Sequence, residues 1–345
     1  MKKLILTIGI FTAAFSGSAQ DIHFSQMPFS PLQLNPALAG ANATLQAHVN
    51  YRTQWKAVST PYKTFAFSAD GRLNFKNKRR NGHLVAGLQL FNDQSGDAAV
   101  TNFQVMLTVG YHLILDPTST LGVAMYGGFG QRSMDPNKGR WGSQYVNDAF
   151  NDQLLSGESF TSNTVNYGDF GAGLVYRYKD DERYMTSNDG KEFNYGFAMY
   201  HVNTPFYSFL LSKDQAGDED VLRMRYSIFA NGTIGLGNSR VSIMPGIYYQ
   251  RQNRAQEFLI GTYFKYRLTD ASKVTGFNKG ASLAIGTFYR NKDAFVVKGL
   301  LEWHDYTFGI AYDVNVSSLS EMSKTRGGVE VVLRYKLVEP RNLIR

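Results

Sequence analysis

The stretch from Tyr306 to Val316 restricts the fold of this chain more than any other part of the sequence. Its even-numbered residues are Tyr, Phe, Ile, Tyr, Val and Val, and its odd-numbered residues are Thr, Gly, Ala, Asp and Asn. Successive side chains of a β-strand point to opposite faces, so the segment predicts a strand with one apolar face and one small, polar face. Its length is about what a tilted strand needs to cross the hydrocarbon layer of a membrane.

The same alternation recurs about fourteen times along the chain. Lipid offers backbone groups no hydrogen-bond partner, and only a closed barrel leaves no strand edge unpaired. The recurrence therefore predicts an all-β fold, a transmembrane antiparallel β-barrel of about 14 strands. A soluble β-sandwich or lipocalin-like barrel would instead have to bury every apolar face in one core. The predicted strands are 45–52, 64–70, 84–90, 102–113, 120–130, 170–178, 193–201, 226–236, 241–249, 258–268, 283–289, 295–303, 306–316 and 329–337.

Composition agrees with strands that cross a membrane. Aromatic residues make up 14% of the 345 residues, and 33 are glycine, a mixture that favours strands and tight turns over helices. After the first twenty residues, no run reaches the roughly eighteen apolar residues of a transmembrane helix. The net charge of +8 fits a charged lumen or contact with lipid headgroups better than nucleic acid, which an exported chain seldom meets.

Ionised side chains indicate which face of the barrel points inward. An ionised group on the lipid side near the midplane costs about 2–4 kcal/mol, so the face that carries such groups must line the lumen. On that same face, glycines such as Gly87, Gly173 and Gly309 leave room for water or for an inserted segment of the chain. The predicted lumen charges are Arg52, Lys265, Arg290, Lys298, Glu302, Asp313, Glu330 and Arg334.

The connections predict which end of the barrel faces outward. Outer-membrane barrels have short periplasmic turns and long extracellular loops. Short turns at Asp116-Pro117, Gly237-Asn238 and His304-Asp305 fall at one end, and the long connections 132–166 and 203–223 fall at the other. An even number of strands then places both chain termini on the periplasmic side.

Segments outside the strands complete the predicted domain organisation. Residues 1–19 resemble a signal peptide: Met1-Lys2-Lys3 precedes an apolar run that ends in small residues at Ala19. Residues 20–42 contain three prolines, which cannot donate to a sheet ladder. This irregular segment is expected in the periplasm or in the lumen. The barrel itself would span residues 43–337, followed by a periplasmic tail at 338–345.

No pattern in the sequence indicates catalysis, a cofactor or a metal site. The chain has no cysteine, and its six histidines are scattered along it. No nucleophile, phosphate-loop or zinc-protease motif is found after the first twenty residues. The acidic run 214–220 could hold calcium, although a solvated loop is the better interpretation. The basic run 76–80 is interpreted as a solvated turn that could also touch anionic headgroups.

Several motifs resemble those of the PorP/SprF family. The resemblance covers nearly the whole chain after residue 19, and it implies an outer-membrane barrel of the type IX secretion system of Bacteroidetes. That system is tied to gliding motility and to the delivery of large adhesins to the cell surface. The motifs are Leu34–Gly40 (LNPALAG), Tyr51–Trp55 (YRTQW), Gly87–Asp97 (GLQLFNDQSGD), Tyr312–Ser320 (YDVNVSSLS) and Gly327–Glu330 (GGVE).

These motifs supply the candidate residues for contact with a partner or with an inserted segment. Asn35 and Pro36 set a turn before the first strand, and Gly40 ends it. Trp55 could dock a partner or pack on its own loop. Asp313 and Asn315 could hold an inserted segment or pair with the next strand. The complete set is Asn35, Pro36, Gly40, Arg52, Trp55, Asp313, Asn315 and Arg334.

The resemblance and the absence of catalytic motifs together predict a non-enzymatic outer-membrane component of the secretion system. It would help to secrete, hold or anchor surface proteins by protein–protein binding. Its expected partners are a secreted protein with a C-terminal sorting domain, other secretion components of the periplasm or outer membrane, and outer-membrane lipid. The alternative is an outer-membrane porin or small-solute transporter, since fourteen strands enclose more space than wall side chains fill.

Overall fold

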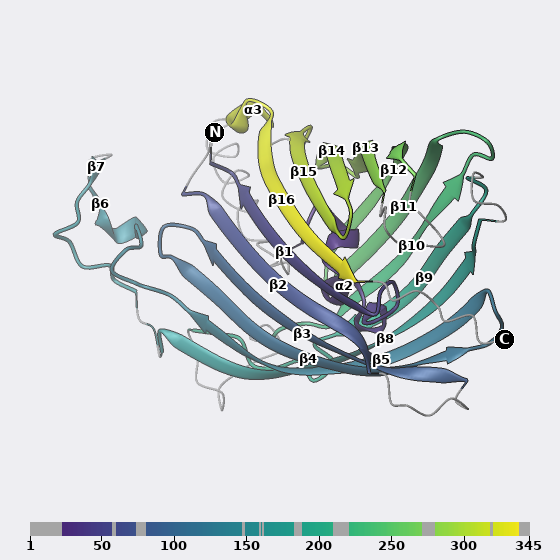
Figure 1. The fold of residues 1–345 in the computed structure, drawn as a ribbon. Helices are drawn as coiled ribbons and strands as arrows, with labels where there is room; N and C mark the ends of the chain where they lie inside the picture. Colours follow the sequence, from purple (N-terminus) through teal and green to yellow (C-terminus); the bar gives the residue numbers. More distant parts are fainter. Residues whose placement is uncertain are drawn as a thin grey trace, which may run out of the picture.

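A computed structural model shows that the chain forms one closed antiparallel barrel of fourteen strands, as predicted (Figure 1). It describes residues 23–56, 60–73, 81–146, 149–158, 160, 162–182, 188–209, 221–270, 280–317 and 320–337. The predicted signal peptide, the basic run 76–80, the acidic run 214–220 and the C-terminal tail lie outside the described residues. None of the described helices is long and apolar enough to cross a membrane.

Each wall strand pairs with its neighbours in chain order, and the last pairs with the first, Leu45 opposite Leu337. The wall strands are β1 Leu45–Gln54, β2 Tyr62–Leu73, β3 Gly82–Ser95, β4 Val100–Ile114, β5 Ser119–Ser133, β8 Thr164–Asp180, β9 Lys191–Tyr200, β10 Arg225–Gly235, β11 Val241–Gln252, β12 Ala255–Thr269, β13 Ala281–Arg290, β14 Ala294–Trp303, β15 Tyr306–Asn315 and β16 Arg326–Leu337. Two further short strands, β6 Tyr145–Val146 and β7 Ala149–Phe150, pair with each other outside the barrel wall. Short helices are η1 Met27–Phe29, α2 Pro31–Leu34, η2 Pro36–Leu38, η3 Gly142–Gln144 and α3 Ser320–Ser323.

Most strand boundaries agree with the alternation, and the largest difference is at the start of β8. This strand begins at Thr164, six residues before the predicted start at Phe170. Its added residues keep the period, with Val165 and Tyr167 buried and Thr164 and Asn166 exposed. Because the exposed side chains of Thr164 and Asn166 are polar, the alternation of apolar and polar residues does not reveal this first part of the strand.

The two faces of the wall are sorted as predicted. Apolar side chains point away from the barrel, and Met125 is 68% exposed and Leu107 62% exposed, as expected for positions that lipid covers. Arg52, Lys298 and Glu330 are buried inside the barrel. The lumen therefore holds the ionised groups.

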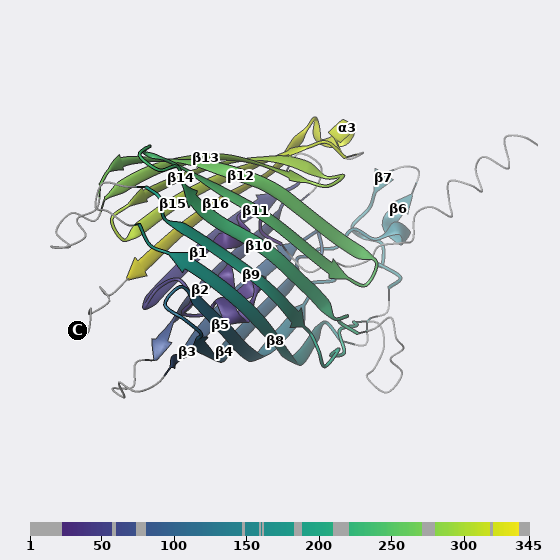
Figure 2. The same ribbon diagram turned by 90° about the vertical axis from the view of Figure 1, so that its right-hand side faces the viewer.

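The two ends of the barrel differ in their connections (Figure 2). At the turn end, where β1 begins and β16 ends, lie the three predicted short turns. At the opposite, loop end lie the two longest connections, 134–163 and 201–224. The connection after β8 packs on a neighbouring turn, because the Asn188 side chain donates to the carbonyl oxygens of Ser239 and Val241 at 2.9 and 2.8 Å.

Residues 23–44, here called the inserted segment, run through the lumen (Figure 1). The Arg52 side chain, two residues before the loop end of β1, donates to the His23 carbonyl oxygen. At the other end of the segment, the Thr44 amide donates to Leu337, where β16 ends. The wall thus begins and ends at the turn end, as predicted, but the chain approaches the wall from the loop end. Residues 23–42 thus lie in the lumen, one of the two places predicted for them, and the two chain termini, which are predicted to be periplasmic, lie outside the described residues.

Candidate functional site

The loop end of the inserted segment is fixed by a buried ionic network, here called the loop-end latch: Ser25, Gln26, Arg52, Arg290, Asp313 and Glu330. The Asp313 carboxylate accepts from the Ser25 hydroxyl at 2.7 Å, from Arg52 at 2.8 Å and from Arg290 at 3.1 Å. The Glu330 carboxylate accepts from the backbone amides of Ser25 and Gln26 at 2.6 and 3.0 Å. Alternation places each wall residue on the lumen face, and strand register brings them to one depth: Arg52 on β1 faces Glu330 on β16.

His23 adds a second contact at this end. Its Nδ1 lies 3.1 Å from a carboxylate oxygen of Glu257 on β12. Burial in the lumen, followed by the charge of Arg52, holds the pKa of His23 well below its usual value. Burial therefore favours the neutral imidazole beside this carboxyl group.

The middle of the inserted segment docks into a notch made by two wall glycines. The Asn35 amide nitrogen donates to the carbonyl oxygens of Leu174 on β8 and Phe197 on β9, both at 3.0 Å. A Cβ on Gly173 would collide with the Asn35 side chain, and a Cβ on Gly196 would lie 2.8 Å from its nitrogen. These two glycines leave the wall open where the Asn-Pro turn enters it.

The Asn-Pro turn itself forms as the sequence predicts. The Asn35 side-chain oxygen accepts from the Ala37 amide at 2.9 Å and caps η2, which Pro36 begins. Gly40 then adopts φ +61°, a left-handed conformation that glycine tolerates best. The turn therefore reverses the segment toward β1.

Apolar side chains fill the lumen around the segment. Met27, Phe29 and Leu34 belong to one buried cluster with wall residues of several strands, including Phe229 and Phe288. Wall glycines make room for these contacts: a Cβ on Gly87 would lie 2.9 Å from Leu32, and one on Gly309 would lie 2.7 Å from the Gln26 side-chain oxygen. The space left by lumen glycines is thus occupied by protein in this part of the barrel.

Backbone carbonyls of the segment are held by two arginines at the turn end. Arg72 donates to the Gly40 oxygen at 2.8 Å and to the Ala41 oxygen at 3.1 Å, and Arg177 also donates to Ala41. The Gly40 amide donates to the Asp70 carboxylate at 2.7 Å. The segment is therefore tied to the wall at both ends and in the middle.

The other three candidate residues lie apart from the loop-end latch. Trp55, at φ +57°, packs its ring on Tyr62, the first residue of β2, with centroids 4.6 Å apart. The Asn315 side chain donates to Ser323 and to the Arg326 carbonyl, so it holds the connection between β15 and β16. Arg334 pairs with Glu302 at 3.3 Å and lies over the Phe29 ring at 5.1 Å, which is a contact with the inserted segment.

Sequence reasoning missed several of the residues that hold the segment. Arg290 and Glu330 were expected in the lumen but not as contacts of the segment, and Arg72, Arg177 and Asp70 were not singled out. Likewise, His83 and His112 are far apart in sequence, but register places them opposite each other with ring centroids 5.2 Å apart. Pairing the predicted strands in order indicates which strands are neighbours, but the register that brings these residues together is not determined by a period of two. Among the described residues, no three potential metal ligands cluster.

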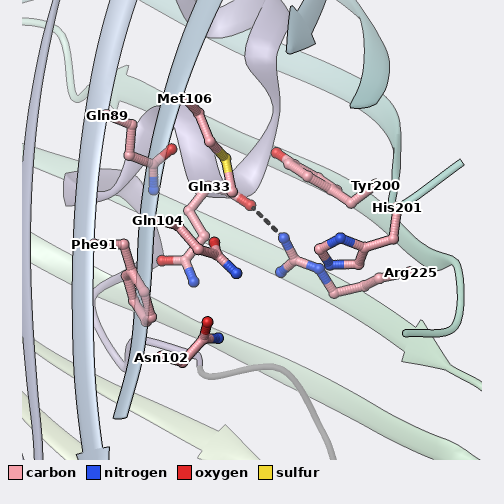
Figure 3. Close-up of a pocket in the computed structure, with 9 residues that line it drawn as sticks. All are labelled: Gln33, Gln89, Phe91, Asn102, Gln104, Met106, Tyr200, His201 and Arg225. Carbon is pink, nitrogen blue, oxygen red and sulfur yellow. Dashed lines mark hydrogen bonds between the residues drawn. The ribbon is translucent and has the colours of Figure 1, made fainter. Parts of the chain in front are cut away.

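A cavity lies beside the inserted segment in the loop-end half of the lumen (Figure 3). With its mouth it has about 350 Å³ of space free of protein atoms. Four carboxamide side chains line it together with Arg225, whose guanidinium lies over the Tyr200 ring at 4.1 Å. The lining residues are Gln33, Gln89, Phe91, Asn102, Gln104, Met106, Tyr200, His201 and Arg225.

Comparison with known proteins finds one matching family and several solved structures that are similar to this chain. Residues 16–335 match the family of the type IX secretion system membrane protein PorP/SprF. No curated protein matches the sequence. Among solved structures, the CymD monoaromatic hydrocarbon channel has a TM-score of 0.44 and 10% identity over 96% of this chain and 97% of that one. The KdgM porin has a TM-score of 0.35 and 8% identity over 84% of this chain and 99% of that one.

Proposed function

The chain belongs to the PorP/SprF family of type IX secretion system membrane proteins, and from this membership we propose that it holds a protein partner at the outer membrane through a barrel that is closed to solutes. The family is one of membrane barrels and not of enzymes. The barrel lies in the outer membrane, with fourteen strands crossing it. Its proposed role is protein binding, in which no covalent bond is made or broken.

The single observation that carries this proposal is the inserted segment. A solute channel needs a continuous water-filled path, but this lumen contains a packed apolar cluster and a buried ionic latch. Of the described residues in the segment, Phe24, Ser25, Gln26, Ala37 and Ala39 are almost fully buried. Such packing is typical of a protein interior. It favours a structural or binding role over transport of small solutes.

The proposed binding surface is the loop end. Outer-membrane barrels direct their long loops outward, so the connections 134–163 and 201–224 would meet a partner outside the cell. In the first of these, Tyr145, Val146 and Phe150 are exposed in the β6–β7 region, and Leu155 is 90% exposed. Apolar side chains exposed together in a loop are typical of protein interaction sites. We expect a secreted surface protein with a C-terminal sorting domain to bind here, and other secretion components to bind at the turn end.

The test is capture from the native membrane. Tagged full-length protein would be crosslinked in cells, purified from detergent-solubilised outer membrane, and its partners identified by mass spectrometry. We expect secreted surface proteins with a sorting domain, and we expect at least tenfold less of them with the double variant Tyr145→Ser/Leu155→Ser. A matched control is Leu107→Ser/Met125→Ser, which changes two apolar residues on the lipid face. Recovery of only lipid and resident porins, or equal recovery from both variants, would overturn the proposal.

The alternative function, a porin or small-solute transporter, makes an opposite prediction. A diffusion channel gives a steady conductance when purified protein is inserted into planar bilayers. We expect wild-type protein to give none, because the inserted segment fills the lumen. A stable open level in most insertions would favour the alternative.

A further inference from the structure

Exposed basic residues gather at the loop end of one sector of the wall, which is formed by the neighbouring strands β11–β16, β1 and β2. None of them forms an ion pair with a described residue. Asp293, an acidic residue in the same sector, is already compensated by Arg290 at 2.8 Å. The residues, here called the basic sector, are Lys56, Lys63, Arg251, Arg254, Lys292, Lys324 and Arg326.

Outward positions at the loop end of β3, β4, β5 and β8 carry no charge. On these strands the alternation continues past the apolar band with neutral side chains. Positive charge is therefore concentrated on one side of the barrel and is not a general property of its loop-end boundary. The neutral residues are Asn92, Gln94, Thr101, Gln131, Ser133, Thr164 and Asn166.

Three residues of the basic sector lie on the lipid face of the wall itself. Arg251 on β11 stands opposite the exposed Tyr226 of β10, and Arg326 on β16 stands opposite Val314. Lys63 takes the outward position at the loop end of β2. Long basic side chains at such positions keep their carbon chains on the apolar surface and extend the charge toward the headgroups. An acidic protein would instead approach from above the loops, so this placement favours lipid as the ligand.

The spacing of the hairpins allows two of them to contact one headgroup. Neighbouring strands are about 4.8 Å apart, so successive hairpins are about 10 Å apart. Arg254 lies in the β11–β12 hairpin, Lys292 in the β13–β14 hairpin and Lys324 in the β15–β16 connection. Side chains of this length can reach a group that lies between two hairpins. Guanidinium groups in particular pair with phosphate through two parallel hydrogen bonds.

We propose that the basic sector binds an anionic lipid whose headgroup carries phosphate, in the leaflet at the loop end. Arg251 and Arg326 contact the phosphate groups, and the apolar residues beside them on the lipid face contact the acyl chains. This inference goes beyond the proposed function, because the ligand is a lipid and no protein partner is needed. The connection 134–163 follows β5 and precedes β8, on the opposite side of the ring of strands. Bound lipid therefore leaves the proposed protein-binding loop free.

Lipid binding can be measured on the purified full-length protein by native mass spectrometry. The probes are diphosphoryl lipid A and phosphatidylethanolamine, which has no net charge. We expect wild-type protein to bind lipid A roughly tenfold more tightly than phosphatidylethanolamine. Inorganic phosphate and hexaglutamate, each added at the concentration of the lipid, should not displace lipid A. Displacement by phosphate would indicate a site for the free ion and displacement by hexaglutamate a site for an acidic protein, and either result would overturn the proposal.

Two matched double variants test the residues. Arg251→Gln/Arg326→Gln should weaken binding of lipid A about 25-fold, because each basic residue near a charged headgroup contributes roughly fivefold in affinity. Lys138→Gln/Arg140→Gln also removes two exposed basic residues at the loop end, but on the opposite side of the barrel, and should bind lipid A as wild type does. Equal weakening in both double variants, or equal affinity of wild type for both lipids, would show that the basic sector is not a lipid site.

Discussion

At the scale of single residues, Asp313 is the centre of the loop-end latch, and Arg52 is its partner from the opposite end of the chain. Removing one member of a buried ion pair costs about 3–5 kcal/mol when the other charge is left unpaired. Because Arg290 still lies 3.1 Å from Asp313, we expect Arg52→Met to lower the free energy of unfolding by up to that amount, measured by urea titration in detergent. Arg251→Met, at an exposed arginine near the same end, should change it by less than about 1 kcal/mol. Equal values for the two variants would contradict a role for the latch.

Replacing glycine by alanine should open the channel at a position that faces the inserted segment and should have no such effect at a position that faces lipid. Gly173→Ala would place a Cβ against Asn35 and Pro36, whereas the Cβ of Gly299→Ala would have its nearest neighbour, Ile310, at 3.7 Å. We expect Gly173→Ala to displace the segment and to produce transient channel openings in planar bilayers. Gly299→Ala should stay closed. If both variants are silent and equally stable, the notch does not hold the segment in place.

The side of the wall that each residue faces was predictable from the sequence. The contacts between residues of different strands were not. Alternation alone places Arg52, Asp313 and Glu330 in the lumen, because each lies on the face opposite the apolar residues of its strand. Their meeting at one depth depends on the register of β1, β15 and β16, which a period of two does not determine. Asn315, two residues beyond Asp313 on the same face, is already too close to the loop end to reach the inserted segment.

At the scale of elements, the inserted segment was recognised as something other than a wall strand because of its prolines. Pro28, Pro31 and Pro36 each lie in the first turn of a short helix, where a missing N–H costs nothing. The sequence left open whether this segment lies in the periplasm or in the lumen. Its apolar residues, such as Phe24, Phe29 and Leu34, have no regular period, so burial against the wall could not be inferred from a pattern.

His23 should make the attachment of this segment sensitive to acid. The pKa of His23, which precedes the first strand, is held well below its usual value by burial and by Arg52. An unfolded chain takes up this proton below about pH 6.5, and the folded chain does not. Stability is therefore lost as pH falls below that value, by at most about 1.4 kcal/mol per pH unit from this group.

The comparison that isolates His23 uses two histidine variants. Free energies of unfolding would be measured at pH 7.5 and 5.5 for wild type, His23→Gln and His304→Gln. We expect the acid-induced loss in His23→Gln to be about 1 kcal/mol smaller than in wild type, and the loss in His304→Gln, at an exposed turn residue, to match wild type. An unchanged loss in His23→Gln would mean that the imidazole takes up its proton in the folded barrel as well.

At the scale of the whole molecule, the barrel has an interior like that of a soluble protein and a lipid-facing exterior. The inserted segment contacts strands from both halves of the wall, through Asn35 at β8 and β9 and through Ser25 at β15 and β16. It therefore links parts of the sheet that do not neighbour each other. A wall supported in this way can present its loops in a fixed arrangement, which a binding role requires and a diffusion pore does not.

The direction in which the barrel faces follows from its connections, and the absence of cysteine makes it measurable without background labelling. Long loops of outer-membrane barrels face outward and short turns face the periplasm, so Leu155 at the loop end and Asn238 at the turn end should lie on opposite sides of the membrane. A membrane-impermeant maleimide added to intact cells should label Leu155→Cys fully. Asn238→Cys should remain unlabelled until the outer membrane is permeabilised. Both positions are exposed on the protein, so a difference in labelling would report the side of the membrane and not burial. The reverse order of labelling would place the loop end in the periplasm, and the proposed partner would then have to be a periplasmic protein.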